Sequence, residues 1–450
     1  MSKRIVTAID IGSTKVVAVI AAVEEGKLPQ VLGVAVQPSL GLKKGVIVNI
    51  DSAISSIATT LEAAERMAGM TVNTIFININ GKHITSTNNK GVVATGNQDE
   101  IVVDDVFRSI ESARTISIPP SREIIHVIPR EFIIDTQNGI KDPIGMSGSR
   151  LEVDTHIISG VSTAIQNLTK CVQSLGLGLD DLVFSGWASA ISTLTDTERQ
   201  LGVLLLDIGG GTTSLCSFVE ESITYSGCIE YGGINVTSDI AICLRTTLES
   251  SEKLKINLPL LFTNNSNQRG NLAPDSAHSR LLNQSPKYII KKTSDVDMDL
   301  IDISMLSIPE IHKVSRKMLE SIIEARMSEI FKMVKEQIEQ AGFSTSMPAG
   351  IVLTGGSSQL PGLTKIAQQI FGVPARVAGP KGLGGMVEEI MTPQFASVQG
   401  LVLHAAGNNK YESKDVRTGN TLRGSGSKEE NSALGMFGKV KNFLGRFGTN

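Results

Sequence analysis

The chain has 450 residues, of which 41% are hydrophobic and 19% are charged, and its formal net charge is −3. This length exceeds what one compact core usually holds, so we expect at least two domains in a folded protein. The negative charge and the aromatic content of 4% argue against nucleic-acid binding, and the four cysteines and six histidines show no metal-ligand or disulfide spacing.

The N-terminal part of the chain predicts strands, one helix and a further strand. Residues 4–9 and 16–23 form apolar strands around a polar turn, and a third strand follows in "VEEGKLPQVLGVAVQPS". Residues 51–68 place apolar side chains at helical spacing, and we expect Asp51 to cap this helix. With the buried strand "TIFININ", these elements indicate an α/β layout.

Residues 82–160 interrupt this layout and predict a small inserted subdomain. They contain a helix in "DEIVVDDVFRSIESAR" and a strand pair in "IPPSREIIHVIPREFIIDTQNG". We expect the α/β pattern to return with "THIISGV" and the helix "STAIQNLTKCVQSLG".

The second half repeats the order of the first half. Residues 201–219 predict strand, glycine turn and strand, and another hairpin follows in "EESITYSGCIEYGG". Residues 260–300 are polar and predict a long loop or a divergent subdomain tip, whereas 309–341 predict a strong helix with a proline in its first turn. Strand, glycine turn and helix follow in "GIVLTGGSSQLPGL".

The ends of the chain have their own signals. The N-terminus enters the first strand without an apolar leader, and no run of 18 apolar residues occurs, so neither a signal peptide nor a transmembrane helix is predicted. We therefore expect a cytosolic body. Residues 408–432 predict a flexible linker, and apolar character returns in "ALGMFGKVKNFLGRFGTN".

One motif occurs twice, as "AIDIGSTK" at residues 8–15 and as "LLDIGGGTTS" at residues 205–214. In both, an aspartate, Asp10 or Asp207, comes near the end of an apolar strand and before a glycine turn. Glycine turns let backbone N–H groups approach a phosphate, and a carboxylate can hold Mg²⁺ through waters. Two facing turns would therefore hold one triphosphate in a cleft between two domains.

The glycines of these turns are also compatible with simpler structures. Either turn alone could be an ordinary hairpin, although the matching order of the pair favours a shared site. A P-loop is excluded because GxxxxGK[ST] is absent, and a dinucleotide site is disfavoured because Gly209–Gly211 lead into a strand pattern. Gly355 and Gly356 follow a buried strand, where adenosine could lie against bare backbone or a plain strand-to-helix turn could form.

The order of the three glycine motifs resembles that of the actin, Hsp70 and sugar-kinase superfamily, and within it the chain resembles the FtsA family of bacterial division proteins. The stretches that carry this resemblance include "IDIGSTKV", "IPPSREIIHVIPREFIIDTQNGIKDPIGMSGSRLEV", "LGVLLLDIGGGTTS" and "GGINVTSDIAICLRTTLESSEKLK". It covers about residues 4–405 and the tail, and it implies an actin-like two-domain α/β fold. The implied ranges are 1–81 and 161–196 for subdomain 1A, 82–160 for an inserted subdomain 1C, 197–245 and 313–407 for 2A, and 246–312 for 2B.

The resemblance also implies which residues bind ATP. Ser357 stands where the family pattern has glycine, and without the family Glu252 and Lys255 would be an ordinary ion pair on a helix. The implied cofactor-binding residues are Gly12, Ser13, Thr14, Lys15, Asp207, Gly209, Gly210, Gly211, Thr212, Thr213, Gly232, Gly233, Asn235, Glu252, Lys255, Gly355, Gly356 and Ser357, with Asp10 and Asp207 toward Mg²⁺.

The function implied by the resemblance is that of a cytoskeletal adaptor at the division septum. It would bind ATP and Mg²⁺ with at most slow hydrolysis, because no residue is marked by spacing as the activator of the attacking water. It would assemble with itself, link the tubulin-like protein FtsZ to the cytoplasmic face of the membrane and help recruit downstream division proteins. The alternatives are a small-molecule kinase of the same fold and a relative of pilus-assembly ATPases.

The last residues predict a helix that lies in an anionic membrane surface. From Ala433 onward there are three basic residues and no acidic residue. The apolar side chains fall within about 120° of a helical wheel. The alternative is a helix packed on the protein body. The predicted membrane-contacting residues within 433–450 are Met436, Phe437, Lys439, Val440, Lys441, Phe443, Leu444, Arg446 and Phe447.

Overall fold

The computed structural model describes residues 3–96, 100–266, 299–309, 311–342, 347–385 and 388–407. The predicted linker, the predicted membrane helix and most of the predicted loop at 260–300 lie outside the described residues.

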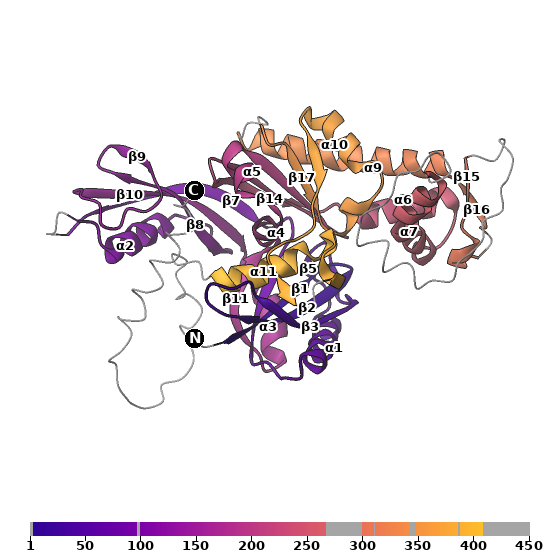
Figure 1. The fold of residues 1–450 in the computed structure, drawn as a ribbon, viewed down its shortest axis with the longest axis horizontal. Coiled ribbons are helices and arrows are strands. Elements are labelled where there is room, and N and C mark those ends of the chain that lie inside the picture. The colour runs from indigo at the N-terminus through magenta and orange to yellow at the C-terminus, as the bar shows by residue number, and fades with distance from the viewer. Residues whose placement is uncertain are drawn as a thin grey trace.

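Two mixed sheets built on the same plan form the body of the molecule (Figure 1). In each, a central antiparallel hairpin is extended by a third antiparallel strand on one side and by two parallel strands on the other. The first sheet has the order β11 (Gly178–Phe184), β6 (Thr74–Ile79), β1 (Arg4–Ile11), β2 (Lys15–Val23), β3 (Gln30–Pro38), β19 (Gly384–Gly385). The second has the order β14 (Ser222–Ile229), β13 (Thr213–Val219), β12 (Val203–Ile208), β17 (Ile351–Thr354), β18 (Ala375–Val377).

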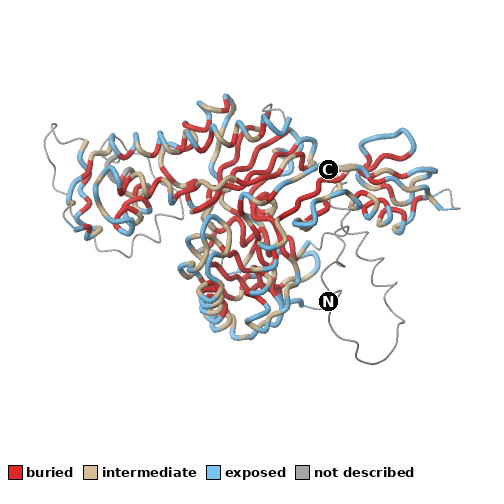
Figure 2. Tube along the Cα trace, turned by 180° about the vertical axis from the view of Figure 1, so that it is seen from behind, coloured by how far each residue is buried: buried red, intermediate tan, exposed pale blue. Residues whose placement is uncertain are grey.

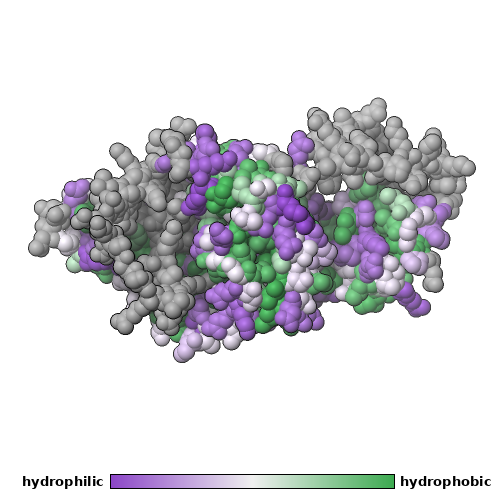
Figure 3. Space-filling model, turned by 90° about the horizontal axis from the view of Figure 1, so that it is seen from below, coloured by the Kyte–Doolittle hydropathy of each residue, from purple (hydrophilic) through white to green (hydrophobic). Residues whose placement is uncertain are grey.

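Both sheets are covered on two faces, which explains why their central strands are continuous apolar runs. On the first sheet, Ile9 packs toward α1 (Ile50–Ala68) and α3 (Ser162–Ser174), while the neighbouring Ala8 packs toward the opposite face. Buried residues are concentrated in the sheets and the region between them (Figure 2). The underside of the molecule interleaves polar and apolar residues (Figure 3).

A further group of helices belongs to the second half of the molecule. Leu204 and Leu206 of β12 share a core with several of them. They are α5 (Asp196–Leu201), α6 (Gly233–Leu244), α7 (Leu248–Ser266), α9 (Arg316–Gln340) and α10 (Leu363–Phe371). Two small hairpins are β4 (Leu42–Lys43) with β5 (Val46–Ile47), and β15 (Leu300–Asp302) with β16 (Lys313–Ser315).

Two helices at the junction of the two sheets cross and pack against each other. The helix α4 (Ser185–Thr193) follows β11 of the first sheet but contacts β12 and β13 of the second, and its Trp187 ring stacks on Phe218 at 6.2 Å. The helix α11 (Ala396–Gly407) comes after β19 of the first sheet and covers β1 and β2 of that same sheet. A Cβ at Gly400 would lie only 1.7 Å from the carbonyl oxygen of Ala188, so only glycine permits this crossing.

This crossing corrects the predicted end of the second-domain segment at residue 407. The strand β19 pairs with β3, and α11 packs on the first sheet, so the chain returns to the first domain before residue 407. The prediction failed because α11 is buried nearly all round and has no polar face that would indicate where it docks. The other predicted subdomain boundaries remain predictions.

Two predicted helix starts also need correction. Asn49, not Asp51, caps α1, since its side chain accepts a hydrogen bond of 2.9 Å from the Ser52 N–H. The helix predicted from 309 begins only at Arg316, where the Ser315 hydroxyl accepts from the Met318 N–H. The residues just before it pair as β16 instead.

The inserted segment forms a separate four-stranded sheet with its own apolar core. Its elements are β7 (Thr85–Ala94), β10 (Arg150–Val161), β8 (Arg122–Ile134), β9 (Gln137–Ile140) and α2 (Val103–Arg114). The stretch "THIISGV" belongs to β10 of this sheet, so the expectation that it restarts the outer α/β pattern was wrong. The polar strand β7 was not predicted.

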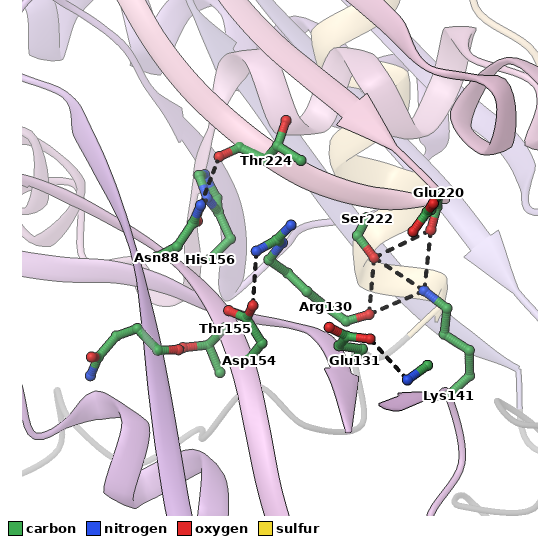
Figure 4. Close-up of polar contacts among 12 residues, drawn as sticks. Asn88, Arg130, Glu131, Lys141, Asp154, Thr155, His156, Glu220, Ser222 and Thr224 are labelled. Carbon is green, nitrogen blue, oxygen red and sulfur yellow. Dashed lines mark hydrogen bonds and ion pairs between the residues drawn. The ribbon is translucent and has the colours of Figure 1, made fainter. Parts of the chain in front are cut away.

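Polar side chains fasten the insert to the edge strand β14 of the second sheet (Figure 4). The Asn88 amide donates to the Thr224 carbonyl at 3.1 Å, and the buried His156 lies 2.7 Å from both the Asn88 carbonyl oxygen and the Ser226 hydroxyl. Lys141 donates to the Glu220 carbonyl from the next hairpin of the insert. These contacts protect the backbone of an edge strand that would otherwise be open to pairing.

Burial, with Arg130 and His126 nearby, lowers the pKa of His156 to about 3. Since the unfolded chain takes up this proton near pH 6.5, the stabilising effect is complete above that pH and is lost as pH falls toward 3. We expect His156 to cost about 2 kcal/mol of stability on going from pH 7.5 to pH 5. Urea unfolding at both pH values should show a smaller drop for His156→Gln. Equal drops in variant and wild type would contradict this assignment.

Candidate nucleotide and metal site

The two predicted glycine turns have the same backbone geometry. The Gly12 N–H donates to the Lys15 carbonyl at 3.0 Å, and the Gly209 N–H donates to the Thr212 carbonyl at 2.9 Å. Asp10 and Asp207 occupy matching places, each one residue before the last residue of its strand. The repeat in the sequence is therefore a repeat in structure.

Both turns line one cleft between the two sheets. It brings together these predicted residues: Asp10, Gly12, Ser13, Thr14, Lys15, Asp207, Gly209, Gly210, Gly211, Thr212, Gly355 and Gly356. It also contains residues that were not predicted: Ile11, Gly45, Asn78, Asn80, Ser185, Pro393, Gln394 and Ser397.

Close approaches explain a glycine of the second turn and another in the turn that follows β17. A Cβ at Gly210 would lie 2.3 Å from the Thr14 side chain, across the cleft. A Cβ at Gly355, whose φ is +82°, would lie 2.3 Å from Oδ1 of Asp207. The turns thus form a cradle of bare backbone in which N–H groups can approach a phosphate.

Asp10 and Asp207 enter the cleft from different sheets. Asp10 is buried and accepts from the Asn78 amide and, at 3.4 Å, from the Ser397 hydroxyl. Asp207 accepts from the Ser189 hydroxyl at 2.6 Å. Burial raises the pKa of each carboxyl to about 6, so the ionised pair is held in an environment that favours a cation beside it.

Lys15 supplies a cation on the same side as the first turn. Its Nζ donates to the Gln394 carbonyl at 3.0 Å and lies 4.3 Å from the centroid of the Phe395 ring. Burial lowers the pKa of Lys15 to about 8, although Asp10 and Asp207 oppose this shift. Burial therefore outweighs the attraction of the two carboxylates, and a phosphate beside Lys15 would stabilise its ammonium form.

The polar side chains of the cleft suit Mg²⁺ that binds together with a phosphate better than they suit a metal ion held by protein ligands alone. Within the described residues, no group of three or more His, Cys, Asp or Glu side chains could hold a metal ion. Two carboxylates above a phosphate cradle suit Mg²⁺, which keeps several waters and takes phosphate oxygens as further ligands.

Several predicted residues lie behind the second turn instead of in the cleft lining. The Thr213 hydroxyl donates to the Tyr231 carbonyl, and the Gly233 N–H donates to the Gly209 carbonyl at 3.0 Å. A Cβ at Gly232 would lie 2.6 Å from the carbonyl oxygen of Gly209. Asn235 accepts from the Gly232 N–H and so closes the first turn of α6. This arrangement fixes the second turn against the start of α6.

The residues predicted to reach adenosine form a cluster next to Gly233. Lys255 donates to the Glu252 carboxylate at 2.7 Å and to the Gly233 carbonyl at 3.2 Å. The Ser357 hydroxyl donates to the Gly209 carbonyl at 2.9 Å. Through Gly209, Ser357 is joined to the cleft lining, whereas Lys255 and Glu252 lie behind it, and the part of all three in binding adenosine remains a prediction.

The sequence analysis missed the polar side chains that support the turns. Asn80 donates to the Thr212 hydroxyl at 3.0 Å, and its carbonyl oxygen accepts from Ser214, so it joins the first sheet to the second turn. Asn78 and Asn80 alternate with isoleucine at the end of an otherwise apolar strand, which is a signal that could have found them. No comparable pattern marks Ser189 or Ser397.

Two parts of the chain match protein families. Residues 81–159 match the family described as "SHS2 domain inserted in FTSA", and residues 204–400 match the family "Cell division protein FtsA".

Whole-length relatives agree with these matches, and each is named "Cell division protein FtsA". The relative from Borreliella burgdorferi is 36% identical over 91% of this chain and 93% of its own length. The relative from Pseudomonas aeruginosa is 34% identical over 90% and 89%, and that from Bacillus subtilis is 32% identical over 91% and 85%.

A solved structure described as "PilM-PilN type IV pilus biogenesis complex" is similar in fold. It covers 89% of this chain and 98% of its own, with a TM-score of 0.58 and 14% sequence identity. At this identity the likeness concerns the fold alone. Together with the family matches, it confirms the predicted actin-like α/β fold.

Asp10→Asn should stabilise the ligand-free protein at pH 7.5. Because burial raises the pKa of Asp10 from 3.8 to about 6, the folded protein loses stability as pH rises between these two values, on the order of 3 kcal/mol in total. Asparagine keeps an oxygen for the Asn78 and Ser397 donors. We expect the thermal midpoint without ligand to rise by a few degrees and the further rise on adding Mg²⁺ and ATP to shrink. A variant less stable than wild type, yet fully stabilised by Mg²⁺ and ATP, would contradict this account.

Proposed function

Because the chain belongs to the FtsA family of cell division proteins, we propose that it binds one ATP with Mg²⁺ and uses the nucleotide to set its conformation. The observation that carries this proposal is the pair of matching turns that face one cleft, with Asp10 and Asp207 beside them.

Each part of the cleft has a distinct task in this proposal. The N–H groups of the turns at Gly12 and Gly209 donate to phosphate oxygens, and Lys15 neutralises part of their charge. Asp10 and Asp207, one from each sheet, would hold the ion, which would supply charge neutralisation at the phosphates. Since the two turns belong to different sheets, one nucleotide favours a closed arrangement of both.

The same cleft supports slow hydrolysis at most. Rapid turnover needs a group that orients or deprotonates the attacking water. Among the described residues that line the cleft, the acidic side chains are Asp10 and Asp207, and both are assigned to the metal. A small-molecule kinase would need a further carboxylate base in this lining, so the adaptor is the better supported function.

The proposed cellular role is to tether FtsZ to the cytoplasmic face of the membrane at the division septum. We propose that copies of the chain assemble with one another and help to recruit later division proteins. Within the described ranges, no helix combines the length and apolarity that a membrane crossing requires. We propose instead that residues 433–450 bind an anionic membrane surface as an amphipathic helix, each copy weakly and an assembly firmly.

Asp207→Ala should weaken ATP binding by about tenfold or more when Mg²⁺ is present, because it removes a carboxylate that faces the metal. Titration with a fluorescent ATP analogue measures the affinity. Asp196→Ala is the matched control, since the side chain of Asp196 is 88% exposed on α5. Equal affinity of Asp207→Ala and wild type would refute the assignment of this cleft.

Phe437→Glu combined with Phe443→Glu should release the protein from anionic vesicles while ATP affinity stays unchanged. Each large apolar side chain contributes on the order of 1.5–3 kcal/mol if fully buried. Vesicle flotation measures binding, and Asn431→Glu with Ser432→Glu adds the same charge just before the tail as a control. Flotation of the Phe variant at the wild-type level would exclude the tail as the anchor.

A further inference from the structure

One helix supports both carboxylates of the cleft. Ser185 and Ser189 are four residues apart on α4, so they lie on the same face of the helix, one turn from each other. The Ser189 hydroxyl donates directly to Oδ2 of Asp207 at 2.6 Å. Ser185 supports Asp10 indirectly. Its hydroxyl accepts from the Asn78 amide at 3.0 Å, and the same amide donates to Asp10.

Asn78 transmits this support to Asp10. Its amide nitrogen donates to both Asp10 and Ser185, and its carbonyl oxygen accepts from the Ile11 N–H at 2.6 Å. Asn78 is only 3% exposed, and its amide has protein partners on both its oxygen and its nitrogen. These three contacts fix the orientation of the Asn78 amide. They therefore also fix the direction of the N–H group that donates to Asp10.

The helix that carries these serines is itself fixed in place. Gly400 of α11 lies directly on the Ala188 carbonyl, and Ala188 shares one buried apolar cluster with Val398 and Leu401 of α11. From α11, Ser397 adds a second contact to Asp10. The spacing between the two carboxylates is thus set by a rigid pair of crossed helices, although the carboxylates come from different sheets.

We infer that Ser189 and Asn78 are positioning residues that fix the orientation in which Asp207 and Asp10 would present their oxygens to one hydrated Mg²⁺. The inference rests on the proposed binding of ATP with Mg²⁺. Mg²⁺ demands a nearly ideal octahedron, so carboxylates that drift apart can no longer share its water ligands. Groups that orient the ligands of a metal typically change metal affinity by about 10–100-fold when they are removed.

The test compares two buried serines of the same helix. Ser189→Ala removes the donor to Asp207, whereas Ser192→Ala removes a hydroxyl that donates only to backbone carbonyls. ATP affinity is measured by calorimetry with Mg²⁺ and again with a chelator. Ser189→Ala should lose about 10-fold or more of the affinity gained from Mg²⁺, while its metal-free affinity stays within about twofold of wild type. Ser192→Ala should keep the full gain.

A second set of variants tests the support of Asp10, and a spectroscopic measurement is added to the calorimetry. Ser185→Ala leaves Asn78 with fewer partners, so it should lose part of the Mg²⁺-dependent gain, and the double variant with Ser189→Ala should lose most of it. Mn²⁺ in place of Mg²⁺ should give a sharper electron paramagnetic resonance spectrum with wild type and ATP than with Ser189→Ala. A full Mg²⁺ gain in both single variants and in the double variant overturns the inference alone. A wild-type protein without any Mg²⁺-dependent gain overturns the Mg²⁺ proposal and this inference with it.

Discussion

The contact between Gly400 and the carbonyl of Ala188 is the constraint on which the two halves of the molecule depend. The helix α4 follows β11 of the first sheet and contacts β12 and β13 of the second, whereas α11 packs on the first sheet. The two halves are therefore packed together where these helices meet. The same helices bring Ser189 and Ser397 to the carboxylates. A bulkier residue than glycine at 400 would separate the helices and move the walls of the cleft.

The duplicated hairpin builds the site where the two halves of the molecule meet, and neither half could form this site alone. One turn offers a few N–H groups, which bind a phosphate weakly, whereas two facing turns surround it and place two carboxylates where they can hold a cation beside it. This arrangement has a cost in the absence of ligand, because Asp10 and Asp207 are buried and their pKa values are raised to about 6. Local destabilisation of this kind is common where a site is prepared for a charged ligand.

Local patterns predicted the hairpins, the glycine turns and the paired aspartates, because these depend on a few neighbouring residues. The rest depends on contacts between distant parts of the chain. The strand β7 is polar because its Asn88 binds the backbone of β14, more than 130 residues away. The helix α4 consists mainly of small residues, which pack closely in the crossing but give no apolar stripe. Lys255 and Ser357, about 100 residues apart in the chain, both lie against Gly233, a proximity that only the arrangement in space reveals.

The central claim is that carboxylates from both sheets act on one ion beside the nucleotide. A double-mutant cycle of Asp10→Asn and Asp207→Asn, with the Mg²⁺-dependent part of ATP affinity as the readout, tests it most directly. If the two share one hydrated Mg²⁺, each single change removes most of that part, and the double variant is scarcely weaker than either single variant. Losses that simply add would show that the two carboxylates act independently, and would contradict the account.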